Sequence, residues 1–225
     1  MAEPLAVIVG AGPGIGLAVA RRFRGAGFRV AAVARPDDPL GAFQAALSGL
    51  VLGADLAREG ALAGALESIG AWGGAPEVLV YNASAGARGP AAELDPGQLL
   101  EAFQVSAGAA LAAAQWALPA MRRAGRGTLL FTGGGLALAP KPGLAAASLG
   151  KAALRSLALA LGQELAAEGI HAATVTITGF VQAGTTLSPE RVAEAFWELH
   201  AQARAHWVHE RVLAPDPGGD FTHPR

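Results

Sequence analysis

The chain has 225 residues, with 17 lysines and arginines against 18 acidic residues, and it has no cysteine. The net charge of −1 gives no general attraction to nucleic acid or to an anionic membrane. The absence of cysteine excludes disulfides, thiolate catalysis and cysteine-ligated metals. No segment reads as a signal peptide, and no apolar run reaches the roughly 18 residues of a membrane span. We therefore expect a cytoplasmic protein that binds neither nucleic acid nor membrane.

Apolar runs alternate with segments of helical periodicity along the chain. The apolar runs predict strands at residues 5–10, 28–34, 50–53, 77–81, 127–132, 171–177 and 207–213. The helical spacing predicts helices at residues 15–26, 39–47, 56–71, 96–123, 144–168 and 189–203. This alternation predicts an α/β fold, a doubly wound parallel sheet covered on both faces, in a single domain over residues 1–225. The turn-rich residues 214–225 are expected to form a flexible tail.

A glycine-rich turn joins the first predicted strand to the first predicted helix. Glycine is abundant, with 31 in the chain, so the placement of this turn is more informative than its glycines alone. Backbone N–H groups at the start of a helix can bind a pyrophosphate, and small residues let the backbone approach it. The residues of this predicted dinucleotide turn are Gly10, Ala11, Gly12, Pro13, Gly14, Ile15 and Gly16.

The end of the second predicted strand bears on the choice of cofactor. Ala34 stands where an Asp would bind the ribose 2′-hydroxyl of NAD, and Arg35 follows it. An arginine can pair with the 2′-phosphate of NADP, so the pattern favours NADP(H) over NAD(H). The alternative is that Arg35 is only a solvated residue at the end of a strand.

Later strand ends carry further candidate binding residues. Asp55 and Leu56 follow the third predicted strand, and Asn82 follows the fourth. Asp55 can also cap the helix expected from Leu56, and the two roles are compatible. Lys151 lies in the fifth predicted helix, and the segment from Thr178 to Val181 follows the sixth strand.

The order and spacing of these segments resemble the short-chain dehydrogenase/reductase family over about residues 5–213. The resemblance rests on the Gly-x-x-x-Gly-x-Gly turn, Asp55-Leu56, Tyr81-Asn82-Ala83-Ser84, the Lys151 helix and the Thr178–Val181 loop. It implies a Rossmann fold, an oxidoreductase function and a bound dinucleotide. It also implies the cofactor-binding residues Gly10, Gly12, Pro13, Gly14, Ile15, Gly16, Arg35, Asp55, Leu56, Asn82, Ala83, Ser84, Lys151, Gly179 and Val181.

The same resemblance shows an atypical catalytic site. The family's tyrosine, four residues before the lysine, falls on Ala147, its serine on Gly134 and its helix asparagine on Ser106, so only Lys151 is retained. Ser148 offers a hydroxyl beside the tyrosine position, but adjacent helix residues face about 100° apart, which makes it a poor substitute.

Two functions therefore remain open. The first is an atypical NADPH-dependent oxidoreductase acting on a small molecule of unknown identity. The second is a catalytically inactive nucleotide-binding pseudoenzyme that acts as a redox sensor or partner protein. A carbonyl bound without the tyrosine and serine lacks a proton donor and an oxyanion partner, and a placed general acid alone is worth roughly 10²–10⁴-fold in rate.

Assembly and metal binding are the last expectations. Small apolar residues in the two long predicted helices suggest helix packing between subunits, as in a homodimer or homotetramer. The residues in question are Ala109, Ala110, Ala113, Ala114, Leu157 and Leu161. No metal site is expected, since the spacing of His206 and His209 fits a strand edge better than a ligand pair. The short segment between Gly179 and Pro189 predicts an open site.

Overall fold

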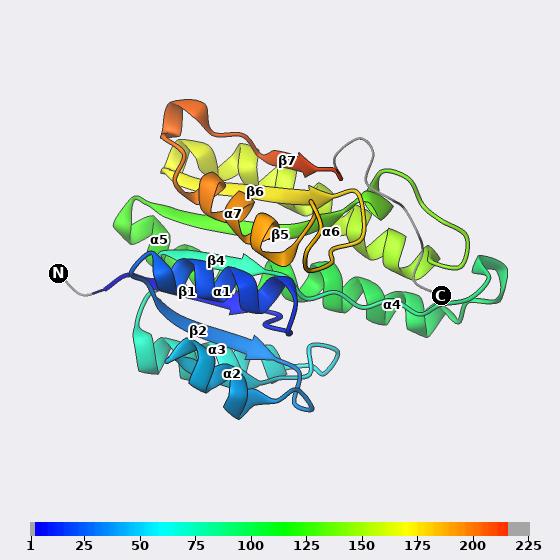
Figure 1. Ribbon diagram of the computed structural model, residues 1–225, viewed down its shortest axis with the longest axis horizontal. Coiled ribbons are helices and arrows are strands. Elements are labelled where there is room, and N and C mark those ends of the chain that lie inside the picture. The colour runs from blue at the N-terminus through cyan, green and yellow to red at the C-terminus, as the bar shows by residue number, and fades with distance from the viewer. Residues whose placement is uncertain (1–2, 216–225) are drawn as a thin grey trace.

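Parallel strands form one sheet through the centre of the molecule, which the computed structural model describes over residues 3–215 (Figure 1). Within those residues the sheet has seven strands in the order β3-β2-β1-β4-β5-β6-β7. The strands are β1 (Leu5–Val9), β2 (Arg29–Ala34), β3 (Leu50–Gly53), β4 (Val78–Tyr81), β5 (Gly127–Gly134), β6 (Ile170–Ile177) and β7 (Glu210–Leu213). Every adjacent pair is parallel, so the predicted doubly wound α/β fold is confirmed.

Helices cover both faces of the sheet. One face packs against α1 (Ile15–Gly25), α2 (Leu40–Leu47) and α7 (Pro189–His200), and the other against α3 (Ala61–Gly73), α5 (Ala109–Ala124) and α6 (Ala145–Leu165). The helix α4 (Pro96–Phe103) precedes α5 and packs against α6. In Figure 1, α1 and α7 lie together over the nearer face.

Alternate residues of the central strands enter opposite cores, as the pleat of a strand requires. Val7 and Val9 of β1 belong to the core under α3, α5 and α6, whereas Ala6 and Ile8 belong to the core under α1, α2 and α7. All of β1 is buried, which explains why its sequence is a continuous apolar run rather than an alternating one.

Two predicted helices differ from the structure. The helix expected at residues 56–71 begins only at Ala61, because Asp55 accepts a hydrogen bond from the Ala57 N–H at 3.1 Å and the chain then turns through Gly60 at a φ of +76°. Asp55 therefore does not cap this helix. The long helix expected at residues 96–123 is interrupted by a π-helical segment, Gln104–Gly108, between α4 and α5.

The last part of the chain differs from the prediction in where its final strand begins. The strand expected at residues 207–213 begins at Glu210, and His206 lies in a single 3-10 turn, Arg204–His206. No cluster of three potential ligands that could hold a metal occurs within residues 3–215. Of the predicted tail, Pro215 lies near Gly179, and residues 216–225 lie outside the described residues. No helix in the described part of the chain is long and apolar enough to cross a membrane.

The residues expected to pack between subunits lie inside the chain instead. The alanines and Leu161 are buried in the core beneath α3, α5 and α6 and are not available to a second subunit, whereas Leu157 packs against this core and is partly buried. The residues are Ala109, Ala110, Ala113, Ala114, Leu157 and Leu161. Helical periodicity identified a packed face correctly but could not distinguish an internal contact from an external one.

One buried and one partly buried histidine predict that the folded state loses stability in mild acid. His171 is buried in β6 between the carbonyls of Leu199 and Val208, at 3.1 and 3.0 Å, and His200 lies 2.9 Å from the Thr128 hydroxyl. Burial lowers the pKa of both histidines below the usual value. Below about pH 6.5 the unfolded chain therefore binds more protons than the folded chain, and stability falls as the pH falls.

The loss accumulates as the pH falls from about 6.5 to the lower pKa that each histidine has in the folded state. Urea unfolding at pH 7.5 and pH 5.5 measures it. The difference between the two pH values should shrink in His171→Gln and persist in His206→Gln, which replaces an exposed histidine. Equal pH dependence in the starting protein and in His171→Gln would contradict this prediction.

Candidate functional site

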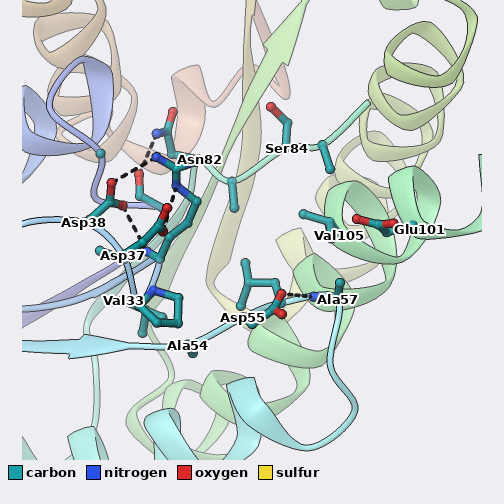
Figure 2. Close-up of a pocket in the computed structure, with 18 residues that line it drawn as sticks. Val33, Asp37, Asp38, Ala54, Asp55, Ala57, Asn82, Ser84, Glu101 and Val105 are labelled. Atoms are coloured by element: carbon teal, nitrogen blue, oxygen red, sulfur yellow. Dashed lines mark hydrogen bonds and ion pairs between the residues drawn. The ribbon is translucent and has the colours of Figure 1, made fainter. Parts of the chain in front are cut away.

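Two cavities open at the carboxyl ends of the central strands, where the strand order reverses between β1 and β4. This reversal is where open α/β sheets bind their ligands. The cavities measure about 610 and 630 Å³, and Asn82 and Ser84 line both of them. They therefore form two halves of one groove, and Figure 2 shows the first half.

The glycines of the β1–α1 turn have two different roles. Gly10 has a φ of +94°, and a Cβ on it would lie 2.4 Å from the Ala83 nitrogen. A Cβ on Gly16 would lie 2.2 Å from the Gly10 carbonyl oxygen. These two positions therefore require glycine because backbone approaches backbone. By contrast, a Cβ on Gly12 or Gly14 would meet nothing within 4 Å, so the turn is open on that side.

The start of α1 is arranged to receive a negative charge. Gly14 is the N-cap residue, no described side chain caps the helix, and its first turn carries no acidic residue. The first N–H groups of a helix lack partners within the helix, and the helix dipole is positive at this end. An anion that reaches the open side of the turn would accept hydrogen bonds from these N–H groups and would be attracted by the positive end of the dipole.

The first cavity is rich in carboxylates. Asp55 and Glu101 line it together with the Arg35–Asp38 segment (Figure 2). Arg35 Nη2 donates to Asp38 at 3.0 Å, its Nε lies 3.8 Å from Asp37, and its backbone N–H also donates to Asp38. The hydrogen bond to Asp38 raises the pKa of the Arg35 guanidinium above its ordinary value. The side chain remains 74 % exposed, so most of its donors still face solvent.

Asn82 joins three strand ends. Its side-chain amide donates to the Gly10 carbonyl at 2.7 Å and accepts from the Thr132 hydroxyl at 2.8 Å. Its backbone N–H donates to the Val9 carbonyl at 2.7 Å. Asn82 therefore fixes the ends of β1, β4 and β5 relative to one another, in the wall that the two cavities share.

Lys151 is the central charged group of the second cavity. It projects from α6, and its ammonium donates to the Thr132 carbonyl at 2.7 Å. Burial lowers the pKa of Lys151 to about 8. An ammonium has three donor hydrogens, so two remain for other partners.

The three positions at which the family resemblance predicts catalytic side chains differ in accessibility. Gly134 lines the second cavity in an extended conformation, and a Cβ there would make ordinary contact with Lys151 at 3.6 Å. Ala147 lies one helical turn before Lys151, packed closely against Gly86. Ser106 is buried in the π-helical segment with its hydroxyl 3.5 Å from the Ala85 nitrogen, and it lines neither cavity.

Neither remaining hydroxyl candidate reaches the groove. The phenol of Tyr81, the only tyrosine of the chain, is buried and donates to the Val105 carbonyl in the π-helical segment. Burial raises the pKa of this phenol well above its usual value. The Ser148 hydroxyl donates to the Leu144 carbonyl at 2.8 Å within its own helix. Both groups therefore stabilise the backbone.

The structure brings together most of the residues that the sequence indicated. Lining the groove are Gly10, Gly12, Ile15, Arg35, Asp55, Leu56, Asn82, Ala83, Ser84, Gly134, Lys151, Gly179 and Val181. Pro13 and Gly14 are exposed at the turn, Gly16 is buried behind it, and Ala147 lines neither cavity. Sequence reasoning missed Asp37, Asp38, Glu101 and Lys141 as lining residues, although the spacing of Arg35 and Asp38 could have indicated their ion pair.

Comparisons with known proteins agree with this geometry. A family model described as short chain dehydrogenase matches residues 4–194. The oxidoreductase asL5 of Sarocladium schorii is 31 % identical over 205 residues, which cover 88 % of this chain and 79 % of that protein.

Solved structures extend the likeness to three dimensions. The structure of a metagenomic short-chain oxidoreductase in complex with NADP has a TM-score of 0.83 and 25 % identity, with 95 % of this chain and 98 % of that chain covered. A short-chain dehydrogenase from Rhodopseudomonas palustris has a TM-score of 0.82 and 27 % identity over the same shares of the two chains. The fold that these proteins share binds NAD(P). The chain belongs to the short-chain dehydrogenase family.

Proposed function

We propose that this protein binds NADP(H) and is an oxidoreductase of its family with a degenerate carbonyl-reduction site, acting on a small molecule of unknown identity. The observation that carries the proposal is a complete groove beside an incomplete catalytic set. The groove retains the open glycine turn, the uncapped start of α1 and the Asn82–Thr132–Lys151 hydrogen bonds. Ala147 and Gly134 supply no donor.

The chain's own residues fit the dinucleotide. The turn from Gly10 to Gly16 would hold the pyrophosphate, since its open side has the space that a Cβ on Gly12 or Gly14 would fill. Asp55, Leu56, Asn82, Ala83 and Ser84 would enclose the adenosine half, and Lys151, Gly179 and Val181 the nicotinamide half. The distribution of these residues over both cavities supports one extended ligand.

Bound NADPH supplies a hydride to an electrophilic carbon. Reduction of a carbonyl also requires a proton on its oxygen, and neither Ala147 nor Gly134 can donate one. Lys151 provides a fixed positive charge whose position is set by its hydrogen bond to Thr132. A fixed cation stabilises developing negative charge but does not replace an oriented phenol and hydroxyl. We therefore expect weak or absent turnover of simple ketones.

The lack of a side-chain donor at Ala147 and Gly134 also favours a second candidate function. This function is a nucleotide-binding pseudoenzyme that acts as a redox sensor or partner protein. Steady-state NADPH oxidation over a panel of aldehydes and ketones, with NADPH binding measured in parallel, tests the two. Turnover that Lys151→Ala abolishes supports the oxidoreductase. Binding without turnover favours the sensor or partner, and absence of binding contradicts both.

NADPH should bind about tenfold or more tightly than NADH, because charge-assisted bonds from Arg35 would hold the 2′-phosphate. Calorimetric titration should show that Arg35→Ala removes most of this preference. Asp37→Asn should increase it several-fold, because the Asp37 carboxylate lies 3.8 Å from the Arg35 guanidinium and would repel a phosphate bound there. Equal affinity of the starting protein for the two cofactors would refute the assignment.

We also propose that the protein is a homodimer or homotetramer. Large apolar side chains are exposed on α4, α5 and α6, at Leu100, Phe103, Leu111 and Leu149. Exposed apolar surface of this kind is commonly covered by another subunit. Light scattering at micromolar concentration should give a multiple of the chain mass, and Leu100→Glu with Phe103→Glu should give the monomer. Val208→Glu, at an exposed apolar position elsewhere, is the control.

A further inference from the structure

The two halves of the groove have opposite charge. Four acidic residues and one arginine line the first cavity, whereas both lysines of the chain and no acidic residue line the second. Lys151 stands at the inner wall, and Lys141 comes from the exposed loop between β5 and α6. A lysine-poor chain therefore places its entire complement of lysines in one cavity.

No interaction within the described residues accounts for the position of the Lys141 side chain. Within residues 3–215 its ammonium makes no hydrogen bond or ion pair, and its side chain is exposed. The loop is fixed nevertheless, because the Gly89 N–H donates to the Gly143 carbonyl at 3.1 Å and Gly89 pairs with Leu144. The segment that faces this loop contributes another cation, Arg88, rather than an acidic residue.

The rest of the second cavity is mainly apolar. Leu136, Leu138 and Leu144 line it beside Lys141, and Leu138 is half exposed. An apolar wall with a cation at its rim is complementary to a molecule with an apolar body and an anionic end.

The lack of donors at Ala147 and Gly134 suggests how binding of such a molecule would contribute to the reaction. Ala147 and Gly134 supply no side-chain donor to orient a carbonyl oxygen. A part of the bound molecule remote from the reacting carbon can then supply the orientation, which is a known use of binding energy. A charged end held at Lys141 would supply it.

We propose that the second cavity binds a small molecule with an apolar body and an anionic head group, a carboxylate or a phosphate, with the head group at Lys141. The proposal rests on the proposed function, because the nicotinamide half of NADP(H) would occupy the part of this cavity at Lys151, Gly179 and Val181, beside the bound molecule. The site would therefore bind an anionic amphiphilic molecule more tightly than a neutral ketone.

Calorimetric titration of the protein saturated with NADP⁺ tests the proposal with octanoate, octyl phosphate and octanamide as probes. At least one of the two anions should bind about fivefold or more tightly than the amide, and the tighter one identifies the head group. Lys141→Gln should remove the difference and Lys141→Arg should retain it. Leu138→Ser should weaken the anion and the amide alike, because it alters only the apolar wall.

Equal binding of the amide and both anions would overturn the proposal, as would absence of binding by all three or an unchanged anion preference in Lys141→Gln. A loss of NADPH affinity in Lys141→Gln would also overturn it, since it would place the lysine on the cofactor. The same titrations are made without NADP⁺. Anion binding there, together with failure to bind NADPH, would contradict the proposed function and leave the anion site supported.

Discussion

The double variant Ala147→Tyr with Gly134→Ser should oxidise NADPH on small ketones and aldehydes roughly 10²–10⁴-fold faster than the starting chain, which is the usual contribution of a placed general acid. Position 147 lies four residues before Lys151 on α6, so the two side chains share a helix face. A phenol there would have its pKa lowered by the nearby ammonium. At Gly134 the extended backbone accepts a side chain without strain, at ordinary contact distance from Lys151.

The matched control is Ala147→Phe with Gly134→Ala, which adds similar volume and no hydroxyl. Steady-state NADPH oxidation by both variants, with NADPH affinity measured in parallel, separates chemistry from binding. A double variant no faster than this control would show that the missing hydroxyls do not limit the reaction. Robust turnover by the starting chain that survives Lys151→Ala would show that another group supplies the proton.

Alanine substitutions in the glycine turn should divide into two classes. Gly10→Ala and Gly16→Ala should lower the free energy of unfolding by several kcal/mol, because each new Cβ would lie within 2.4 Å of a backbone atom. Gly12→Ala and Gly14→Ala should change it by no more than about 1 kcal/mol, since their Cβ atoms meet open space. They should instead weaken NADPH binding tenfold or more, because the pyrophosphate would need that space.

Urea unfolding and NADPH titration of the four variants measure both effects. The distinction matters because a loss of cofactor binding in Gly16→Ala alone could result from a damaged fold. If all four variants lost stability equally, the open side of the turn would be part of the packed structure and its assignment to the pyrophosphate would be wrong. If Gly12→Ala and Gly14→Ala bound NADPH normally, the same assignment would fail for the opposite reason.

The sequence was informative wherever one local pattern decided the structure. The predicted segments located the strands of the described sheet, and in β1 and β4 the apolar run is continuous because a strand buried on both faces has no polar residues to interrupt it. The glycine turn and Lys151 were found for a similar reason, since each stands at a fixed distance from a strand or helix. Most of the candidate site follows from these local signals.

Features that depend on contacts distant in sequence were not predictable in this way. The alanines of α5 have the same spacing whether they meet a sheet or another subunit, and only the structure shows them in the core. The position of Lys141 likewise depends on a loop whose backbone pairs with Gly89, far earlier in the chain. This pairing places a second lysine at the cavity that Lys151 lines.

The hydrogen bond from Tyr81 to the Val105 carbonyl has a consequence for observing this protein in solution. It joins the end of β4 to the π-helical segment between α4 and α5, behind the wall that separates the two halves of the groove. Since the chain has one tyrosine, tyrosinate absorbance comes from this single place. Because burial raises the pKa of this phenol, the phenol ionises more readily when the junction opens. The molecule therefore contains a built-in optical reporter for local opening beneath its own binding groove, distinct from the signal of its four tryptophans.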